Sequence, residues 1–203
     1  GLGADGHDFE PVVDEFDLDR LPPTRFVFPH APQRAVTING GYVMRAWYDI
    51  LSQDFNGRRE DAAGVIESAA QVEALIAREN ARGIPDRRIV LAGFSQGGAI
   101  ALHTALRIVR AKGLPLQIMD IAGGAGRDLL DVLEAPEFDE SVRVLCRDWS
   151  ESALATGRAA AKERGLTEKI DHVRGDAFDE ESVAGAEPNP AVAVVSGLYE
   201  LFP

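Results

Sequence analysis

The residues best suited to chemistry stand in Gly93-Phe-Ser-Gln-Gly97, where Ser95 occupies the centre of a Gly-x-Ser-x-Gly pattern. An aliphatic run over 89–92 precedes the pattern, and an apolar, alanine-rich helical stretch follows it. Between a strand and a helix, this spacing predicts a tight turn that exposes the Ser95 hydroxyl as a nucleophile. The start of the helix would direct the Gln96 N–H toward a developing oxyanion. A plain glycine-rich turn is the alternative interpretation of the same residues.

A second group of residues suited to chemistry follows in the C-terminal half, where acids end three predicted strands. The strands are predicted over 116–120, 142–148 and 169–175, and the acids are Asp120, Asp148 and Asp176. Gly124 and Gly126 lie in a glycine-rich turn after the first of these strands. Such a turn lets the backbone approach a ligand, and an acid about 20 residues further on suits ribose hydroxyls. The alternative is a plain doubly wound sheet whose aspartates cap helices.

A serine nucleophile needs a general base, and the chain holds 4 histidines. His7 and His30 lie in predicted loop regions, and His103 lies on the predicted helix after the serine turn. His172 falls inside a predicted strand but follows Asp148, which gives the chain order Ser, Asp, His. We therefore predict Ser95, Asp148 and His172 as the catalytic residues. The alternative for each histidine is a packed or surface residue without a catalytic role.

The composition limits the classes of partner. The chain has 33 Asp and Glu against 21 Lys and Arg, and its net charge of −12 argues against nucleic acid and anionic membranes. Cys146 is the single cysteine, which excludes an intrachain disulfide, and we expect no metal site. No apolar run reaches transmembrane length. We expect a small-molecule partner and a cytoplasmic location.

The alternation of strands and helices predicts the fold class. Further strands are predicted over 24–29 and 191–197, and an amphipathic helix over 60–82. Together with 89–92 and the three strands that end in acids, this makes about six strands. Strands that alternate with helices favour a parallel sheet. We therefore predict an α/β fold of three layers, with a mostly parallel sheet and helices on both faces.

The first half carries four motifs, which are Gly1-Leu-Gly-Ala-Asp-Gly6, Phe28-Pro-His-Ala-Pro32, Arg45-Ala-Trp-Tyr-Asp49 and Gly93-Phe-Ser-Gln-Gly-Gly98. In this order they resemble the carboxylesterase and acyl-protein thioesterase branch of the α/β-hydrolases. The resemblance implies hydrolysis of carboxylic or thioester bonds without a cofactor, with Ser95 as the nucleophile. It also implies an oxyanion hole made by the N–H groups of Leu2 and Gln96, and an acyl pocket lined by Trp47.

The last residues, Ser196-Gly-Leu-Tyr-Glu-Leu-Phe-Pro203, follow the final predicted strand. With the acids and glycines of the second half, they resemble a class I S-adenosylmethionine-dependent methyltransferase. This resemblance implies that S-adenosylmethionine is bound by Asp120, Gly124, Gly126, Asp148 and Asp176, with Ala122 in the place of the first loop glycine. We therefore predict a hybrid or truncated fusion of 1–110, a partial hydrolase, with 113–203, a partial methyltransferase. The two parts could share one merged sheet, and a folded chimera without activity is the remaining alternative.

Overall fold

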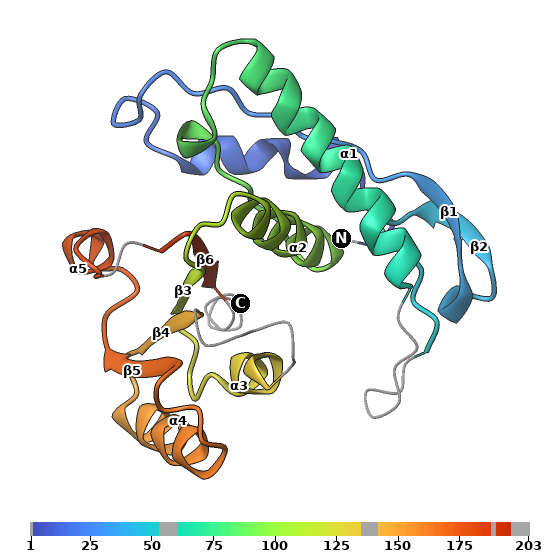
Figure 1. Cartoon of the computed structure of the whole chain (residues 1–203). Coiled ribbons are helices and arrows are strands. Elements are labelled where there is room, and N and C mark those ends of the chain that lie inside the picture. The colour runs from blue at the N-terminus through green and yellow to red at the C-terminus, as the bar shows by residue number, and fades with distance from the viewer. Residues whose placement is uncertain (1, 53–60, 135–141, 188–189, 196–203) are drawn as a thin grey trace. The chain divides into compact units, whose positions relative to one another are not determined.

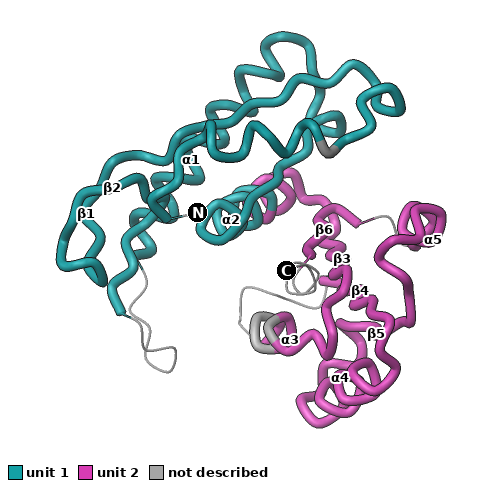
Figure 2. The backbone as a smooth tube through the Cα atoms, turned by 180° about the vertical axis from the view of Figure 1, so that it is seen from behind, with its two compact units in different colours: residues 1–105 teal, residues 106–203 magenta. Residues whose placement is uncertain are grey.

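The computed structural model describes residues 2–52, 61–134, 142–187 and 190–195 of the 203-residue chain (Figure 1). The chain divides into two compact units, Gly1–Ala105 and Leu106–Pro203, which Figure 2 shows in separate colours. Each unit has its own sheet. The predicted segment 196–203 lies outside the described residues. No helix within the described ranges has the length and apolarity needed to cross a bilayer.

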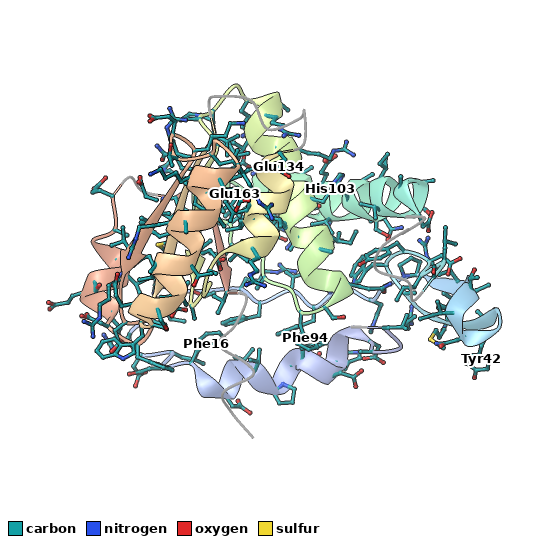
Figure 3. The ribbon with its side chains drawn as sticks, turned by 90° about the horizontal axis from the view of Figure 1, so that it is seen from below. Phe16, Tyr42, Phe94, His103, Glu134 and Glu163 are labelled. Atoms are coloured by element: carbon teal, nitrogen blue, oxygen red, sulfur yellow. The ribbon has the colours of Figure 1, made fainter. Side chains whose placement is uncertain are left out.

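Unit 1 is built around a hairpin and two α-helices. Its elements are η1 (Gly6–Glu15), β1 (Gln33–Val36), η2 (Thr37–Asn39), β2 (Tyr42–Arg45), α1 (Ala62–Ala81), η3 (Asp86–Arg88) and α2 (Gln96–Ala111), the last of which runs past the unit boundary. β1 and β2 pair antiparallel, with Gln33 opposite Arg45. Gly40 and Gly41 connect them with φ angles of 67° and 79°, which favour glycine. Tyr42 begins β2 and is exposed (Figure 3).

Helix α1 confirms the amphipathic pattern predicted over 60–82. The Asp61 carboxylate accepts the Gly64 N–H at 2.9 Å and caps the start of the helix. Gly83 follows the end of the helix with φ 91°. One face of α1 supplies Val65 and Val72 to a core formed by Ala31, Trp47 and Ile100. The burial of this face stabilises the helix beyond its intrinsic propensity.

Two predicted strands are absent from the described structure. Residues 24–29 and 89–92 are extended or irregular and pair with no strand among the described residues, and Val90 is 89% exposed. An aliphatic run becomes a strand only where a neighbour accepts and donates its backbone hydrogen bonds. In the described residues, four strands form one parallel sheet and two form an antiparallel hairpin, in place of a single sheet of about six strands.

Unit 2 is an α/β unit with a parallel sheet. Its elements after α2 are β3 (Gln117–Ile121), α3 (Arg127–Leu133), β4 (Arg143–Asp148), α4 (Glu151–Glu163), β5 (Ile170–Arg174), α5 (Glu180–Ala184) and β6 (Val192–Val195). The strand order is β5-β4-β3-β6, and all three pairings are parallel (Figure 1). The chain thus moves outward from β3 to β5 and returns to the other side of β3. This reversal is the place where doubly wound sheets bind ligands, beyond the carboxyl ends of the strands.

Strand β3 lies inside the sheet of unit 2. Both edges of β3 are already paired, one with β4 and the other with β6. The α/β class and the parallel sheet are confirmed, but the strand before Ser95 is not part of that sheet.

Candidate functional site

The turn at Ser95 has the backbone of a nucleophile elbow. Ser95 is exposed and has φ 54°, a left-handed conformation that a non-glycine residue seldom adopts. The chain closes the turn with a hydrogen bond from Gly97 N–H to the Phe94 carbonyl at 2.9 Å, and α2 begins at Gln96. Phe94 lies beside η1, with its ring 6.4 Å from that of Phe9 (Figure 3). The turn presents the Ser95 hydroxyl to solvent at the start of a helix.

The two glycines of the motif have different roles in this turn. A Cβ on Gly93 would lie 2.3 Å from the carbonyl carbon and oxygen of Gly97 and 2.6 Å from the Gly98 nitrogen. A Cβ on Gly97 would meet only the Trp47 Nε1 at 3.6 Å, an ordinary contact. Crowding by backbone atoms therefore requires glycine at position 93 but not at position 97. The close approach of 93 to the helix start is what requires glycine.

Hydrogen bonds of the Gln96 side chain hold the segment around Trp47 beside the Ser95 turn. Its Oε1 accepts the Trp47 N–H at 3.1 Å, and its Nε2 donates to the Tyr48 carbonyl at 2.8 Å. Ser68 of α1 donates to the Trp47 carbonyl. Gln96 is 3% exposed, so its amide is fully committed to positioning this segment. The Trp47 ring packs with Ala31 and Ile100.

The predicted oxyanion loop, which contains Leu2, is tied down at two points. Gly3 N–H donates to the Arg45 carbonyl at 2.8 Å, and Gly6 N–H donates to the His30 Nδ1 at 3.0 Å. A Cβ on Gly6 would lie 2.3 Å from the Phe28 carbonyl oxygen. The role of His30 as an acceptor for this loop was not predicted. The sequence signal for this role was the position of His30 inside Phe28-Pro-His-Ala-Pro32. This motif and the loop are both part of the resemblance to the carboxylesterase branch.

The histidines of unit 1 have contacts of their own. His7 is exposed, and its Nδ1 lies 2.5 Å from a Glu10 carboxylate oxygen. The hydrogen bond and charge of Glu10 raise the pKa of His7. His103 lies on α2, two turns after Ser95 (Figure 3). Ser95 belongs to unit 1, whereas Asp148 and His172 belong to unit 2.

Unit 2 gathers the predicted cofactor residues at the carboxyl end of its sheet. Asp120 lies in β3 and is 2% exposed, and the loop after it contains Gly124 with φ 58° and Gly126 with φ 63°. Ala122, in the place of the expected first glycine, has φ 58°. A left-handed alanine costs about 1–2 kcal/mol, so this departure from the family pattern strains the loop. The need for glycine at position 123 was not predicted. A Cβ there would lie 2.2 Å from an Asp120 carboxylate oxygen.

The loop over 122–126, here called the glycine loop, follows β3. Asp148 joins this loop to the end of β4. Its Oδ2 accepts the Gly124 N–H at 2.8 Å and its Oδ1 accepts the Ser150 N–H at 2.7 Å. The Asp148 carbonyl accepts the Gly175 N–H at 3.0 Å, which places Asp176 beside it. The structure thus brings Asp120, the glycine loop, Asp148 and Asp176 to one edge of the sheet.

Two further features border this edge. Trp149 follows Asp148, is 65% exposed, and carries the Arg174 guanidinium 4.5 Å from its ring centroid. An open cleft of about 490 Å³ lies between the glycine loop and α4, and it is lined by Gly123, Ala125, Gly126, Arg127, Ala153 and Thr156. In the described part of the chain, no group of three His, Cys, Asp or Glu side chains could hold a metal ion.

His172 is buried in β5 below the glycine loop. It is 7% exposed, and its Nε2 donates to the Ala125 carbonyl at 3.2 Å in the tautomer that this contact requires. Its Nδ1 has no hydrogen-bond partner among the described residues. Burial lowers the pKa of His172, and the nearby Arg158 charge lowers it further. Asp148 accepts from Gly124 and Ser150, so the two residues predicted to complete a triad do not bond to each other. Their predicted catalytic role stays a prediction.

The depressed pKa of His172 predicts how the stability of unit 2 depends on pH. The unfolded chain protonates His172 near its ordinary pKa of about 6.5, but the folded chain does so only at lower pH. Between these values the unfolded state binds more protons, so the free energy of unfolding falls as the pH falls below about 6.5. Urea titrations from about pH 7.5 to about pH 5 should show this slope. His172→Gln should reduce it, and equal slopes for both proteins would contradict the prediction.

Comparison with known proteins identifies both halves. Residues 1–114 match the family model described as phospholipase/carboxylesterase. Residues 75–203 match the family model described as "Putative methyltransferase". The matches overlap over 75–114, which includes the Ser95 turn and the helix that crosses the unit boundary. The hybrid composition predicted from the sequence is confirmed.

The curated relatives include acyl-protein thioesterases. Acyl-protein thioesterase 1 of Neurospora crassa is 42% identical over 111 residues, which cover 52% of this chain and 45% of that protein. Acyl-protein thioesterase 1 of Cryptococcus neoformans var. neoformans is 40% identical over 112 residues, which cover 54% of this chain and 47% of that protein. The chain spans less than half the length of these relatives.

The solved structures include Arabidopsis thaliana SOBER1. Its L63A variant is 26% identical, with a TM-score of 0.52 over 87% of this chain and 86% of that chain. The chain belongs to the phospholipase/carboxylesterase family through residues 1–114 and to the methyltransferase family through residues 75–203.

Proposed function

We propose that unit 1 is the nucleophile-bearing part of a serine hydrolase that acts on small carboxylic esters or thioesters. The observation that carries this proposal is the backbone of Ser95, which is exposed at φ 54° on the turn into α2. A strained turn of this kind holds a serine hydroxyl away from its own backbone and toward a substrate. The acyl-protein thioesterase relatives support the choice of acyl transfer to water. The proposed location is the cytoplasm.

The proposal gives roles to the residues around the turn. The tetrahedral intermediate carries an oxyanion that needs preorganised donors, which would be the N–H groups of Leu2 and Gln96. Anchoring of the Leu2 loop to Arg45 and His30 supports this, because a donor that is already held does not reorganise during the reaction. Trp47, held by the Gln96 amide, would line the acyl pocket.

The relay that activates Ser95 is a separate part of the proposal. The chain order assigns Asp148 and His172 to it. Their present partners are the glycine loop and the start of α4, which supports a different role for both residues. The base is therefore tested independently of the nucleophile.

The test is covalent labelling with a fluorophosphonate, followed by intact-mass measurement. A single adduct on the wild-type chain that is missing from Ser95→Ala would support an activated Ser95. Labelling that survives in Ser95→Ala, or no labelling of the wild type, would contradict it. The same measurement on His172→Ala decides whether His172 is the base, because a base is needed for fast labelling.

A second candidate function is the binding of S-adenosylmethionine by unit 2. The observation that favours this function is the open space at Gly124. A Cβ there would meet nothing within 4 Å, so the backbone of the loop is open to a ligand. Asp120, Asp148 and Asp176 surround the loop with negative charge, which suits a cationic sulfonium. Gly126, with φ 63°, completes the turn. When bound, the cofactor would supply an electrophilic methyl group.

Calorimetric titration with S-adenosylmethionine tests this second candidate. We expect binding to the wild type and to Ser95→Ala, and at least tenfold weaker binding to Asp148→Ala, because the ribose hydroxyls lose a charged acceptor worth about 1.5–3 kcal/mol. Heat signals that are equal in Asp148→Ala and the wild type would contradict the assignment. A chain that neither binds the cofactor nor reacts with the fluorophosphonate would be a folded chimera without activity.

A further inference from the structure

Three polar side chains lie in one row across the sheet of unit 2. Asp120 of β3 is in register with Cys146 of β4, and Cys146 is in register with His172 of β5. Residues in register on neighbouring strands share a face, so these side chains lie side by side. Their exposed fractions are 2%, 0% and 7%. A polar row this deeply buried needs partners.

The partners come from the glycine loop. The Cys146 thiol lies 3.8 Å from the Gly124 carbonyl, and the His172 Nε2 lies 3.2 Å from the Ala125 carbonyl. The Gly123 N–H donates to the Arg147 carbonyl at 3.1 Å. Three successive loop residues, 123–125, are therefore in contact with β4 or β5. Of these contacts, the one at Ala125 is made by the imidazole of His172.

The His172 ring fits a space that two glycines leave open. A Cβ on Gly157 of α4 would lie 2.3 Å from the His172 Nε2 and 2.6 Å from the Ala125 carbonyl oxygen. A Cβ on Gly126 would lie 3.5 Å from the same Nε2. The ring thus fills the space between the loop and α4.

We propose that His172 is a positioning residue of unit 2, whose Nε2–H holds the Ala125 carbonyl and keeps the glycine loop in its ligand-binding shape. The proposal rests on the second candidate function. It assigns His172 to the loop of its own unit, in agreement with the contact of its Nε2 with the Ala125 carbonyl. His172 acts through the loop and does not itself touch the ligand.

Cys146 provides a direct measure of loop opening. It is the only cysteine in the chain, it is fully buried, and it lies against the inner face of the loop. Burial raises the pKa of its thiol to about 12, so it reacts slowly while the loop is closed. A thiol reagent can modify it quickly only after the loop opens.

The experiment is the rate of Cys146 modification by N-ethylmaleimide in the full chain under native conditions. His172→Leu fills the space without a donor, whereas His172→Gln places an amide N–H close to the position of the Nε2–H. We expect modification about tenfold faster in His172→Leu, as the loss of one buried hydrogen bond implies, and within about twofold of wild type in His172→Gln. Val173→Ala, an exposed residue on the same strand, is the control and should match the wild type.

Rescue by glutamine separates positioning from simple packing. Equal rates in the leucine and glutamine variants, whether fast or slow, would overturn the proposal. If His172→Leu does not fold in urea titrations, His172→Asn replaces it, because its shorter amide cannot reach Ala125 from the same strand position. Faster modification in His172→Asn than in His172→Gln then supports the proposal, and equal rates in these two variants overturn it.

Titration with S-adenosylhomocysteine distinguishes the proposal from the function on which it rests. If the wild type binds this probe, His172→Leu should bind about tenfold more weakly and His172→Gln equally well. Absence of binding to the wild type would contradict the second candidate function and the ligand-binding part of the proposal. The maleimide rates would still decide whether His172 holds the loop.

Discussion

Replacing Ser95 by alanine is expected to lower the hydrolysis of 4-nitrophenyl acetate and of an acetyl thioester by about three orders of magnitude or more. The expected loss is large because the proposed reaction proceeds through an acyl-enzyme formed on the Ser95 oxygen, and alanine has no atom to replace it. The turn itself should persist, since alanine can replace serine at φ 54° with the same steric demand at Cβ. The measurement is kcat/KM for both substrates at matched protein concentration.

The control for this prediction is Ser152→Ala, an exposed serine at the start of α4 in unit 2. It should hydrolyse both substrates at the wild-type rate. Equal loss in both variants would point to damaged folding, and equal activity of Ser95→Ala and wild type would remove Ser95 from the mechanism. His172→Ala in the same assay separates the two roles discussed for that residue, because only a general base should change kcat by orders of magnitude.

Replacing Gly93 by alanine is expected to destabilise unit 1 by about 2 kcal/mol or more. The new Cβ would lie 2.3 Å from the Gly97 carbonyl carbon and oxygen, and these are backbone atoms at the start of α2. Relief requires a shift of the helix start, which also carries the Gln96 amide that holds Trp47. Fluorophosphonate labelling of Ser95 should fall together with stability, because the turn that presents the hydroxyl is deformed.

Gly97→Ala is the matched control, since its Cβ would meet only Trp47 Nε1 at an ordinary 3.6 Å. Its free energy of unfolding should stay within about 0.5 kcal/mol of wild type. The chain contains 2 tryptophans, Trp47 in unit 1 and Trp149 in unit 2. In a Trp149→Phe background, urea titrations followed by fluorescence therefore report on unit 1 alone. Equal stability of the two glycine variants would show that the close approach at Gly93 is not required.

Much of the local structure could be predicted from the sequence. The apolar periodicity that ends at Gly83 predicted α1, and the aliphatic runs that end in Asp120, Asp148 and the residue before Asp176 predicted β3, β4 and β5. These signals are readable because helix caps, turn glycines and side-chain period act within a few residues. The tight turn at Ser95 is also a local feature, because the pattern that predicts it spans only residues 93–97.

The long-range arrangement was decided by the tertiary structure. Residues 89–92 carry the side chains of a strand, but a strand also needs a partner for its backbone hydrogen bonds, and these residues pair with no strand in the described part of the chain. His172 follows Asp148 in the order of a hydrolase triad, but parallel pairing places it beside Cys146 and beneath Ala125. By itself the sequence determined α1, β3, β4 and β5, the two families and the tight turn at Ser95. Which strand edges are filled and which atoms meet inside the sheet depend on hydrogen bonds between segments far apart in the chain, and these only the folded structure defines.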